Sequence, residues 1–171
     1  LNMRRVEIDE LLDGSQIIDA DAEKNYLIAA YLFDETELKK YMRKNKEEQL
    51  VTGLLYLDNY EEALESVEEV RSSLLIALID RKINKYFAAI DGVVKKLEKD
   101  KYFLVMRRKS LEQLKEKKFN ILEEVKSVNI GNEMAVTISI GIGINADSFA
   151  HTSEAARIAM ELALGRGGDQ V

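Results

Sequence analysis

The chain lacks cysteine altogether and has a single histidine, His151. The absence of cysteine excludes disulfide bonds, thiolate metal sites and nucleophilic catalysis by cysteine. One histidine argues against a histidine-based zinc centre, which draws several ligands from the chain. His151 precedes a predicted helix and is expected to be a surface residue.

Long apolar runs and an excess of positive charge are also missing. No window approaches the roughly 20 apolar residues of a membrane span, and no secretion signal is evident, so we expect this piece to be soluble, without direct membrane insertion. The net charge of −6 argues against nucleic acid as a general partner, because phosphate backbones are bound by basic surfaces. It leaves room for a nucleotide, which needs only one local site.

What the sequence does contain is typical of a globular protein. With 171 residues, 46% of them hydrophobic and 33% charged, it is long enough for one sizeable domain, alone or with a fragment of another. Both ends, LNMRRVEID and GRGGDQV, suggest a piece cut from something longer. The first residues predict a short helix over 6–13, a strand over 15–20 and a mostly buried strand over 25–33.

A polar helix is predicted from Asp34 to about residue 49. The run Asp34-Glu-Thr-Glu37 has the capping-box spacing, and a narrow apolar side follows with Leu38, Tyr41 and Met42. This helix has two interpretations: a solvated linker, or a short dimeric coiled coil that transmits a signal. The second would make the protein a homodimer.

A strand, a long helix and a hairpin are predicted next. Residues 50–58 are typical of a buried strand. Residues 93–97 and 102–107 predict two antiparallel strands around a charged knot, Glu98 to Lys101. The helix between has apolar residues at 3.6-residue spacing, which we expect in the core: Leu74, Leu75, Leu78, Ile79, Ile83, Tyr86, Phe87 and Ile90.

Two further helices are predicted. One opens at Ser110, with Gln113 three residues later at the capping-box spacing. The other is capped by Thr152 or Ser153 and runs to Leu164, where Gly165 ends it. The first of them is expected to bury five apolar side chains: Leu111, Leu114, Phe119, Leu122 and Val125.

Residues 134–144 alternate as in a strand. Gly141 and Gly143 share one face, which leaves room for close approach by a helix or another backbone. From residue 50 the order is therefore strand, helix, hairpin, helix, strand, helix. This order predicts an α/β fold of the α+β sandwich type, a sheet of mixed strand directions flanked by helices.

Three features together resemble the GGDEF family, which makes cyclic di-GMP from two GTP molecules. They are the strand LLYLDNY at 54–60, the hairpin about 40 residues later, and the run TISIGIG from Thr137. The resemblance covers roughly residues 50–171 and implies a nucleotidyl-cyclase-like fold.

The family's signature turn, Gly-Gly-Asp/Glu-Glu-Phe, is replaced here by Glu98, Lys99, Asp100, Lys101 and Tyr102. In the family the two glycines let the triphosphate approach the backbone, and the third position is a metal ligand. That ligand survives as Asp100, whereas the fourth, acidic position has become a lysine. The resemblance thus implies a former nucleotide-binding turn that keeps its place in the fold but has lost the residues needed for catalysis.

The family's first strand reads D-x-D-x-F-K-x-x-N-D, and its first Asp is a metal ligand. Tyr56 stands there in this sequence, Asp58 and Tyr60 match the second Asp and the Phe, and Leu64 replaces the Asn that contacts guanine. Efficient cyclic di-GMP synthesis is therefore not expected, because two Mg²⁺ ions need carboxylates from both strand and turn. The family's inhibitory R-x-x-D motif reads A88-A-I-D91, so high-affinity product binding is not expected either.

The altered turn and the ending ALGRGGDQV resemble the GdpP (YybT) group of membrane-anchored cyclic di-AMP phosphodiesterases. That group carries two transmembrane helices, a PAS sensor, a degenerate GGDEF domain and a catalytic DHH/DHHA1 pair. The resemblance implies the end of a PAS-like domain over residues 1–33, a linker helix over 34–49 and a degenerate GGDEF domain over 50–171. It places the parent protein at the cytoplasmic face of the membrane and its phosphodiesterase site outside this chain.

For the chain itself, the resemblance implies a weak nucleotide site with Asp58, Tyr60 and the turn residues Glu98, Lys99, Asp100 and Lys101. Asp58 and Asp100 are candidate ligands of Mg²⁺ or Mn²⁺, ATP is the candidate nucleotide, and Asp100 is the candidate for slow ATP hydrolysis. Asp58 could instead cap the helix that follows it. The charged knot could equally be a solvated hairpin tip, and the domain a dimerisation scaffold without a ligand.

Overall fold

The computed structural model describes residues 2–7, 26–65, 67–144 and 148–171. The chain divides into two compact units, Leu1–Arg43 and Lys44–Val171, which are described separately. Within the described residues no helix is long and apolar enough to cross a membrane.

The first unit holds a two-stranded antiparallel sheet. Strand β1 (Asn2–Glu7) pairs with β2 (Tyr26–Tyr31), with Asn2 opposite Tyr31. The predicted strand over 25–33 is confirmed for Tyr26–Tyr31, but its predicted burial is wrong where side chains are described, since Ile28 and Tyr31 are 63% and 51% exposed. The prediction of a helix from residue 6 is wrong for residues 6 and 7, because pairing with β2 overrides the local helical pattern; residues 8–13, like the strand predicted over 15–20, lie outside the described residues.

Helix α1 (Thr36–Glu48) confirms the predicted polar helix. Asp34 lies just before its start, and its Oδ1 accepts a hydrogen bond from the Thr36 N–H at 2.9 Å. Hydrogen bonds from the Thr36 side chain and backbone lower the pKa of the Asp34 carboxyl. Leu38, Tyr41 and Met42 are 59%, 67% and 63% exposed. The helix therefore presents an apolar strip that the described residues leave uncovered.

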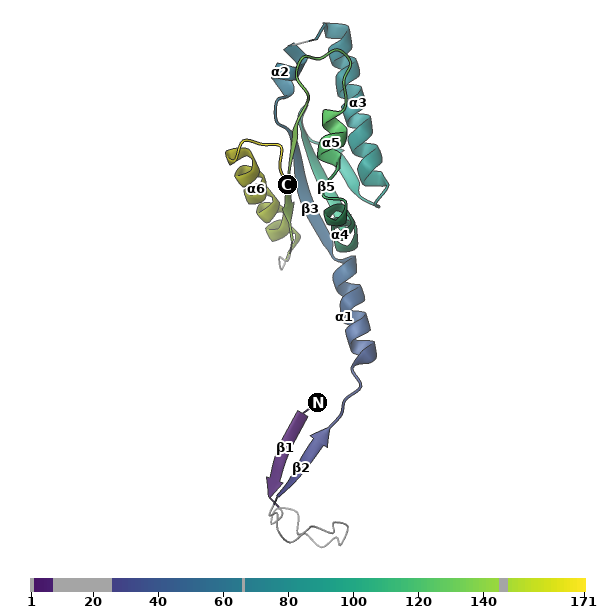
Figure 1. The fold of residues 1–171 in the computed structure, drawn as a ribbon, viewed down its shortest axis with the longest axis vertical. Helices are drawn as coiled ribbons and strands as arrows, with labels where there is room; N and C mark the ends of the chain where they lie inside the picture. The colour runs from purple at the N-terminus through teal and green to yellow at the C-terminus, as the bar shows by residue number, and fades with distance from the viewer. Residues whose placement is uncertain (1, 8–25, 66, 145–147) are drawn as a thin grey trace. The chain divides into compact units, whose positions relative to one another are not determined.

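The second unit contains one four-stranded sheet in the order β4-β5-β3-β6 (Figure 1). Its neighbouring strands all pair antiparallel, so the sheet differs in this respect from the mixed directions that the sequence predicts. The α+β sandwich class is confirmed. Along the chain the elements are β3 (Leu50–Leu57), α2 (Tyr60–Glu65), α3 (Glu69–Ala88), β4 (Val93–Lys96), β5 (Lys101–Arg107), α4 (Arg108–Glu116), α5 (Ile121–Lys126), β6 (Ile138–Gly143) and α6 (Phe149–Gly165).

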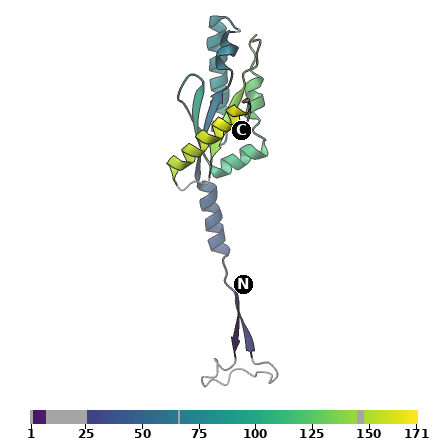
Figure 2. The ribbon, with the colours of Figure 1, turned by 90° about the vertical axis from the view of Figure 1, so that its left-hand side faces the viewer.

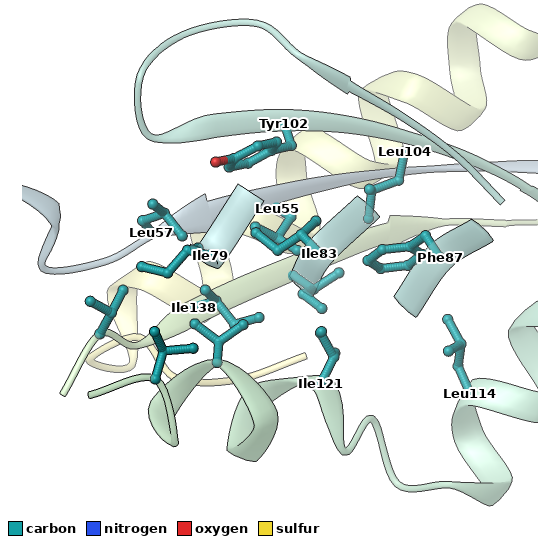
Figure 3. Close-up of a cluster of buried hydrophobic side chains, with 14 of the residues drawn as sticks. Leu55, Leu57, Ile79, Ile83, Phe87, Tyr102, Leu104, Leu114, Ile121 and Ile138 are labelled. Atoms are coloured by element: carbon teal, nitrogen blue, oxygen red, sulfur yellow. The ribbon is translucent and has the colours of Figure 1, made fainter. Parts of the chain in front are cut away.

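The main core lies between the sheet and α3, α4 and α5 (Figures 1 and 3). Leu55 and Leu104 of the sheet and Ile83 of α3 are fully buried there. Most of the predicted α3 stripe is confirmed, but Leu74 is 51% exposed because it lies at the outer edge of the stripe. Burial of a large apolar side chain contributes about 1.5–3 kcal/mol, so this layer is the principal source of stability.

The predicted helix from Ser110 to Val125 is two helices. Lys118 and Phe119 take positive φ angles of 51° and 50° between α4 and α5, which interrupts the helix and changes the face that packs inward. As a result Ile121 is fully buried, and the predicted Leu122 is only partly so.

The caps predicted for the helix at Ser110 and for the last helix both differ in the structure. Ser110 lies within α4, is buried, and donates its hydroxyl to the Ile90 carbonyl at 2.7 Å. The last helix is capped by Ser148, whose side chain accepts the His151 N–H, and Thr152 lies inside that helix. The Ser110 hydroxyl thus serves a buried long-range contact, whereas the Thr152 hydroxyl donates to the Ser148 carbonyl at 2.9 Å, four residues earlier. In both helices a residue nearer the preceding loop begins the helix.

Helix α6 covers the other face of the sheet (Figure 2). It packs on β6 at the two glycines that the sequence singles out. A Cβ atom on Gly141 would lie 2.4 Å from the Ala156 carbonyl oxygen, and one on Gly143 would lie 1.8 Å from the Thr152 carbonyl oxygen. The predicted close approach is confirmed, and only glycine permits it.

Candidate functional site

The charged turn is held beside the end of β3. The backbone N–H groups of Leu97 and Glu98 both donate to the Lys101 carbonyl, at 2.8 and 3.2 Å, which closes the turn. The Asp100 carbonyl accepts the Leu57 N–H at 2.9 Å. This bond brings the third residue of the turn next to the carboxyl end of the central strand.

A cavity of about 260 Å³ opens at this junction. Four of the six candidate nucleotide-binding residues line it: Asp58, Tyr60, Lys99 and Asp100. The remaining lining residues are Leu57, Glu61 and Glu62, from the end of β3 and the first turn of α2. The fold thus gathers strand, helix start and hairpin tip around one small hollow.

The other two candidates, Glu98 and Lys101, do not line the cavity. They form an ion pair with each other at 2.7 Å, and this hydrogen bond raises the pKa of the Lys101 ammonium. Lys101 Nζ also lies 5.5 Å from the ring centroid of Tyr56, directly opposite in β3. Their charges are therefore engaged in holding the turn.

Asp58 is fixed by the far end of the chain. Its Oδ2 accepts the Asp169 N–H at 2.8 Å, and its own N–H donates to the Thr137 carbonyl at 3.0 Å. Gly168, at φ 76°, passes so close that a Cβ there would lie 2.9 Å from the Asp58 Cγ. Among the described residues, the Asp58 carboxylate therefore accepts its hydrogen bond from the backbone of the C-terminal turn.

Sequence reasoning missed this contact, although it identified Gly165 as the end of the last helix. Asp169 is itself held by Lys126 at 2.5 Å, and its carboxylate raises the pKa of that lysine. The Gly-rich turn is a local signal, but nothing local indicates that it reaches a residue 111 positions earlier.

The residues of the cavity fit a hard divalent cation. Asp58 Oδ1 is buried and has no hydrogen-bond partner among the described residues, and Asp100 lines the same hollow with a second carboxylate. Within the described residues no group of three or more acidic, histidine or cysteine side chains could hold a metal alone. Mg²⁺ is commonly bound by one or two carboxylates together with the phosphates of a substrate, and this donor set suits that arrangement.

The cavity is acidic as it stands. Asp58, Glu61, Glu62 and Asp100 line it, and of the described residues around it only Lys99 is cationic. Lys99 lies 3.6 Å from Glu61, with both side chains largely exposed. A phosphate entering without a cation would meet net negative charge, so anion binding here requires a metal ion to reverse the local field.

The fifth residue of the turn ties the hairpin to α3. Tyr102 is 1% exposed, and its hydroxyl donates a hydrogen bond to Asp80. Burial and the Asp80 carboxylate both raise the pKa of Tyr102 far above its usual range. Lys96 Nζ bonds both Asp80 oxygens at 3.0 Å. Asp80, which belongs to no recognisable motif, thus anchors the base of the turn.

Comparison with known proteins decides the family. The family model for the GGDEF domain of GdpP-like cyclic-di-AMP phosphodiesterases matches residues 55–171, more than half of the chain. The chain belongs to this family. A GdpP cyclic-di-AMP phosphodiesterase of Geobacillus thermodenitrificans is 33% identical over 141 residues, which cover 82% of this chain and 21% of that protein. The PdeA cyclic-di-AMP phosphodiesterase of Listeria monocytogenes is 30% identical, with coverage of 82% and 22%.

Solved structures agree on the fold. The GGDEF domain of DgcB from Caulobacter crescentus, solved in complex with c-di-GMP, superposes with a TM-score of 0.61 at 17% identity, over 80% of this chain and 83% of that one. At this identity the likeness establishes the fold alone. The chain spans about a fifth of the length of the curated relatives it matches.

Proposed function

We propose that this chain is a regulatory GGDEF module of a membrane-anchored cyclic-di-AMP phosphodiesterase, and that it binds a nucleotide weakly. The observation that carries the proposal is the cavity that brings Asp58, Tyr60, Lys99 and Asp100 together. Family membership supports it. Because the chain covers about a fifth of its relatives, the phosphodiesterase site is assigned to a DHH/DHHA1 part elsewhere in the parent.

Binding is expected to depend on Mg²⁺ or Mn²⁺. Asp58 and Asp100 would hold the cation, and the cation would supply the positive charge that the acidic lining lacks. Lys99 lines the cavity with a largely exposed side chain whose ammonium lies 3.6 Å from Glu61, and it could turn toward a terminal phosphate. Two carboxylates and one exposed lysine provide few contacts, which accounts for weak binding and for slow ATP hydrolysis.

The proposal is tested by replacing Asp100 with asparagine. Asp100→Asn removes one of the two metal-binding carboxylates, so ATP affinity in Mg²⁺ should fall by about tenfold or more, and any ATP hydrolysis should be lost. Isothermal titration calorimetry measures the first effect and phosphate release the second.

Asp91→Asn is the matched control. Asp91 lies at the other end of the hairpin with φ 56°, a conformation that asparagine tolerates, and the charge change is the same. This control should bind like the parent. If Asp100→Asn binds and hydrolyses ATP as well as the parent does, nucleotide acts at another site and the proposal fails.

A second function, a dimerisation scaffold, is favoured by the exposed strip on α1. Leu38, Tyr41 and Met42 are each more than half exposed, and a two-fold partner could bury them at roughly 1.5–3 kcal/mol per fully buried side chain. The two functions are compatible, because α1 can transmit a signal between the parts of the parent while the cavity holds a nucleotide.

Replacing Leu38 and Met42 together with glutamate should convert a dimer into a folded monomer. The change places four like charges at the seam of each dimer. Analytical ultracentrifugation measures the outcome, with Lys40→Glu on the polar side as a control of equal charge change. A parent that is monomeric at high concentration, or a double variant that stays dimeric, would show that α1 is only a linker.

A further inference from the structure

The C-terminal turn has a backbone geometry that is rare outside functional sites. Three successive residues take positive φ angles, 103° at Gly167, 76° at Gly168 and 57° at Asp169. Glycine adopts such angles readily, and other residues keep them only where surrounding contacts hold them in place. The contacts that hold this turn therefore indicate its role.

Three elements of the domain hold the turn. It follows directly on α6, and the Gly168 N–H donates back to a carbonyl of that helix at 3.1 Å. The Gln170 carbonyl accepts the Ile140 N–H of β6 at 2.8 Å. Lys126, the last residue of α5, forms an ion pair with the Asp169 carboxylate at 2.5 Å. The position of the turn is thus set by α5, α6 and β6 together.

A fourth contact goes from the turn to the cavity beside the hairpin. The Asp169 N–H donates to Asp58 Oδ2 at 2.8 Å. Gly168 is buried against the same carboxylate, since a Cβ atom there would lie 2.9 Å from both the Asp58 Cγ and Oδ2 atoms. The carboxylate is therefore held by a hydrogen bond on one side and by close backbone packing on the other, which fixes its orientation.

This orientation divides the work of the two Asp58 oxygens. Oδ2 is engaged by the turn, whereas Oδ1 is buried and has no hydrogen-bond partner among the described residues. A buried carboxylate oxygen without a partner is costly, and a cation removes that cost. Carboxylates that bind metals are commonly held by hydrogen bonds of their own, and loss of such a partner weakens metal binding by about 10–100-fold.

We infer that the turn Gly167–Asp169 is the positioning element of the metal site at Asp58 and Asp100. It holds Asp58 through Oδ2, leaves Oδ1 to the cation, and makes the metal affinity of the cavity depend on the positions of α5, α6 and β6. Neither Gly168 nor Asp169 lines the cavity, so both act through Asp58. The inference rests on the proposed function and adds a means of regulating the same site.

The Asp169 amide signal provides the first test. Mg²⁺ is titrated into the isotope-labelled chain without nucleotide, and nuclear magnetic resonance follows the amide signals. The Asp169 signal should shift with the same midpoint as the signals of residues 57–62, because its N–H donates to the carboxylate that takes the cation. An Asp169 signal that stays in place while the cavity signals shift would overturn the inference.

Gly168→Ala provides the second test. The new Cβ atom would displace the Asp58 carboxylate, so Mn²⁺ affinity, measured from the electron paramagnetic resonance of free Mn²⁺, should fall by about tenfold or more. Gly165→Ala is the matched control, because a Cβ atom at the end of α6 meets nothing within 4 Å, and it should bind Mn²⁺ like the parent. Thermal melting shows whether each variant is folded. Equal affinity of the parent and a folded Gly168→Ala protein would overturn the inference.

Lys126→Met loosens the turn without straining its backbone, and it decides the matter if Gly168→Ala does not fold. The substitution frees the Asp169 carboxylate and removes a positive charge beside it. Loss of a nearby cation by itself strengthens the binding of Mn²⁺, whereas a loosened turn weakens it. Weaker binding than in the parent is the expected result, and unchanged or stronger binding would show that the turn does not position Asp58.

The metal site and its positioning element fail in different ways. Loss of Mn²⁺ binding in Asp100→Asn, together with full binding in Gly168→Ala, would leave the metal site in place and overturn the role of the turn. A parent chain without saturable Mn²⁺ binding at residues 57–62 would overturn both.

Discussion

Gly143→Ala is expected to prevent the domain from folding, or to lower its free energy of unfolding by more than about 3 kcal/mol. The new Cβ atom would lie 1.8 Å from the Thr152 carbonyl oxygen and 2.8 Å from the Ala156 nitrogen. Both are backbone atoms of α6, which cannot rotate away as a flexible side chain could. Helix α6 would have to move off the sheet, and the burial of Ala156 and Met160 would be lost with it.

Gly165→Ala is the matched control. Gly165 is the last residue of α6, and a Cβ atom there would meet nothing within 4 Å. Alanine favours the helix by up to about 1 kcal/mol over glycine, so this variant should be as stable as the parent or slightly more stable. Urea denaturation followed by circular dichroism compares the three proteins. A Gly143→Ala protein within about 1 kcal/mol of the parent would contradict the described packing of α6.

No diguanylate cyclase activity is expected with Mg²⁺ and GTP. Loss of one metal-binding carboxylate removes several kcal/mol of charge stabilisation, and lowers the rate by roughly 10²-fold or more. Here Tyr56 stands in the place of that carboxylate, with its ring 5.5 Å from Lys101 Nζ. Glu98 and Lys101 close the turn with their own ion pair, where the family has glycine and an acidic residue.

Chromatographic detection of cyclic di-GMP measures this prediction, with an active diguanylate cyclase as the positive control and a reaction without protein as the blank. Product at the level of the blank is the expected result. Turnover comparable to that of the positive control would contradict the assignment of the altered turn as a former catalytic site.

Periodicity predicted the core helix well, because the apolar spacing of α3 is local information. Ile79, Ile83 and Phe87 are buried as that spacing requires. The close packing at the glycines of β6 was equally predictable from the sequence, since two glycines on one face of a strand leave a gap that a helix or another backbone fills. The break between α4 and α5 could not be predicted from the sequence, because it depends on positive φ angles at two non-glycine residues, Lys118 and Phe119.

The candidate site was predictable only where it follows the chain's local motifs. The turn and the end of β3 were placed together through the resemblance, and the cavity contains Asp58 and Asp100. The supports of the site come from distant residues that carry no motif. Asp169 reaches Asp58, and Asp80 reaches Tyr102; such contacts arise only when the sheet and its helices are assembled.

The sharpest test of a metal-dependent nucleotide site at the Asp58–Asp100 cavity is paramagnetic broadening. Mn²⁺ is added to the isotope-labelled chain at substoichiometric concentration, with and without ATP, and the amide signals are recorded. Broadening should centre on residues 57–62 and 98–101 and include Gly168 and Asp169, which contact the Asp58 carboxylate. It should become much stronger when ATP is present, because the phosphates complete the metal's ligands. Broadening centred on any other part of the chain, or no change on addition of ATP, would contradict a metal and nucleotide site at this cavity.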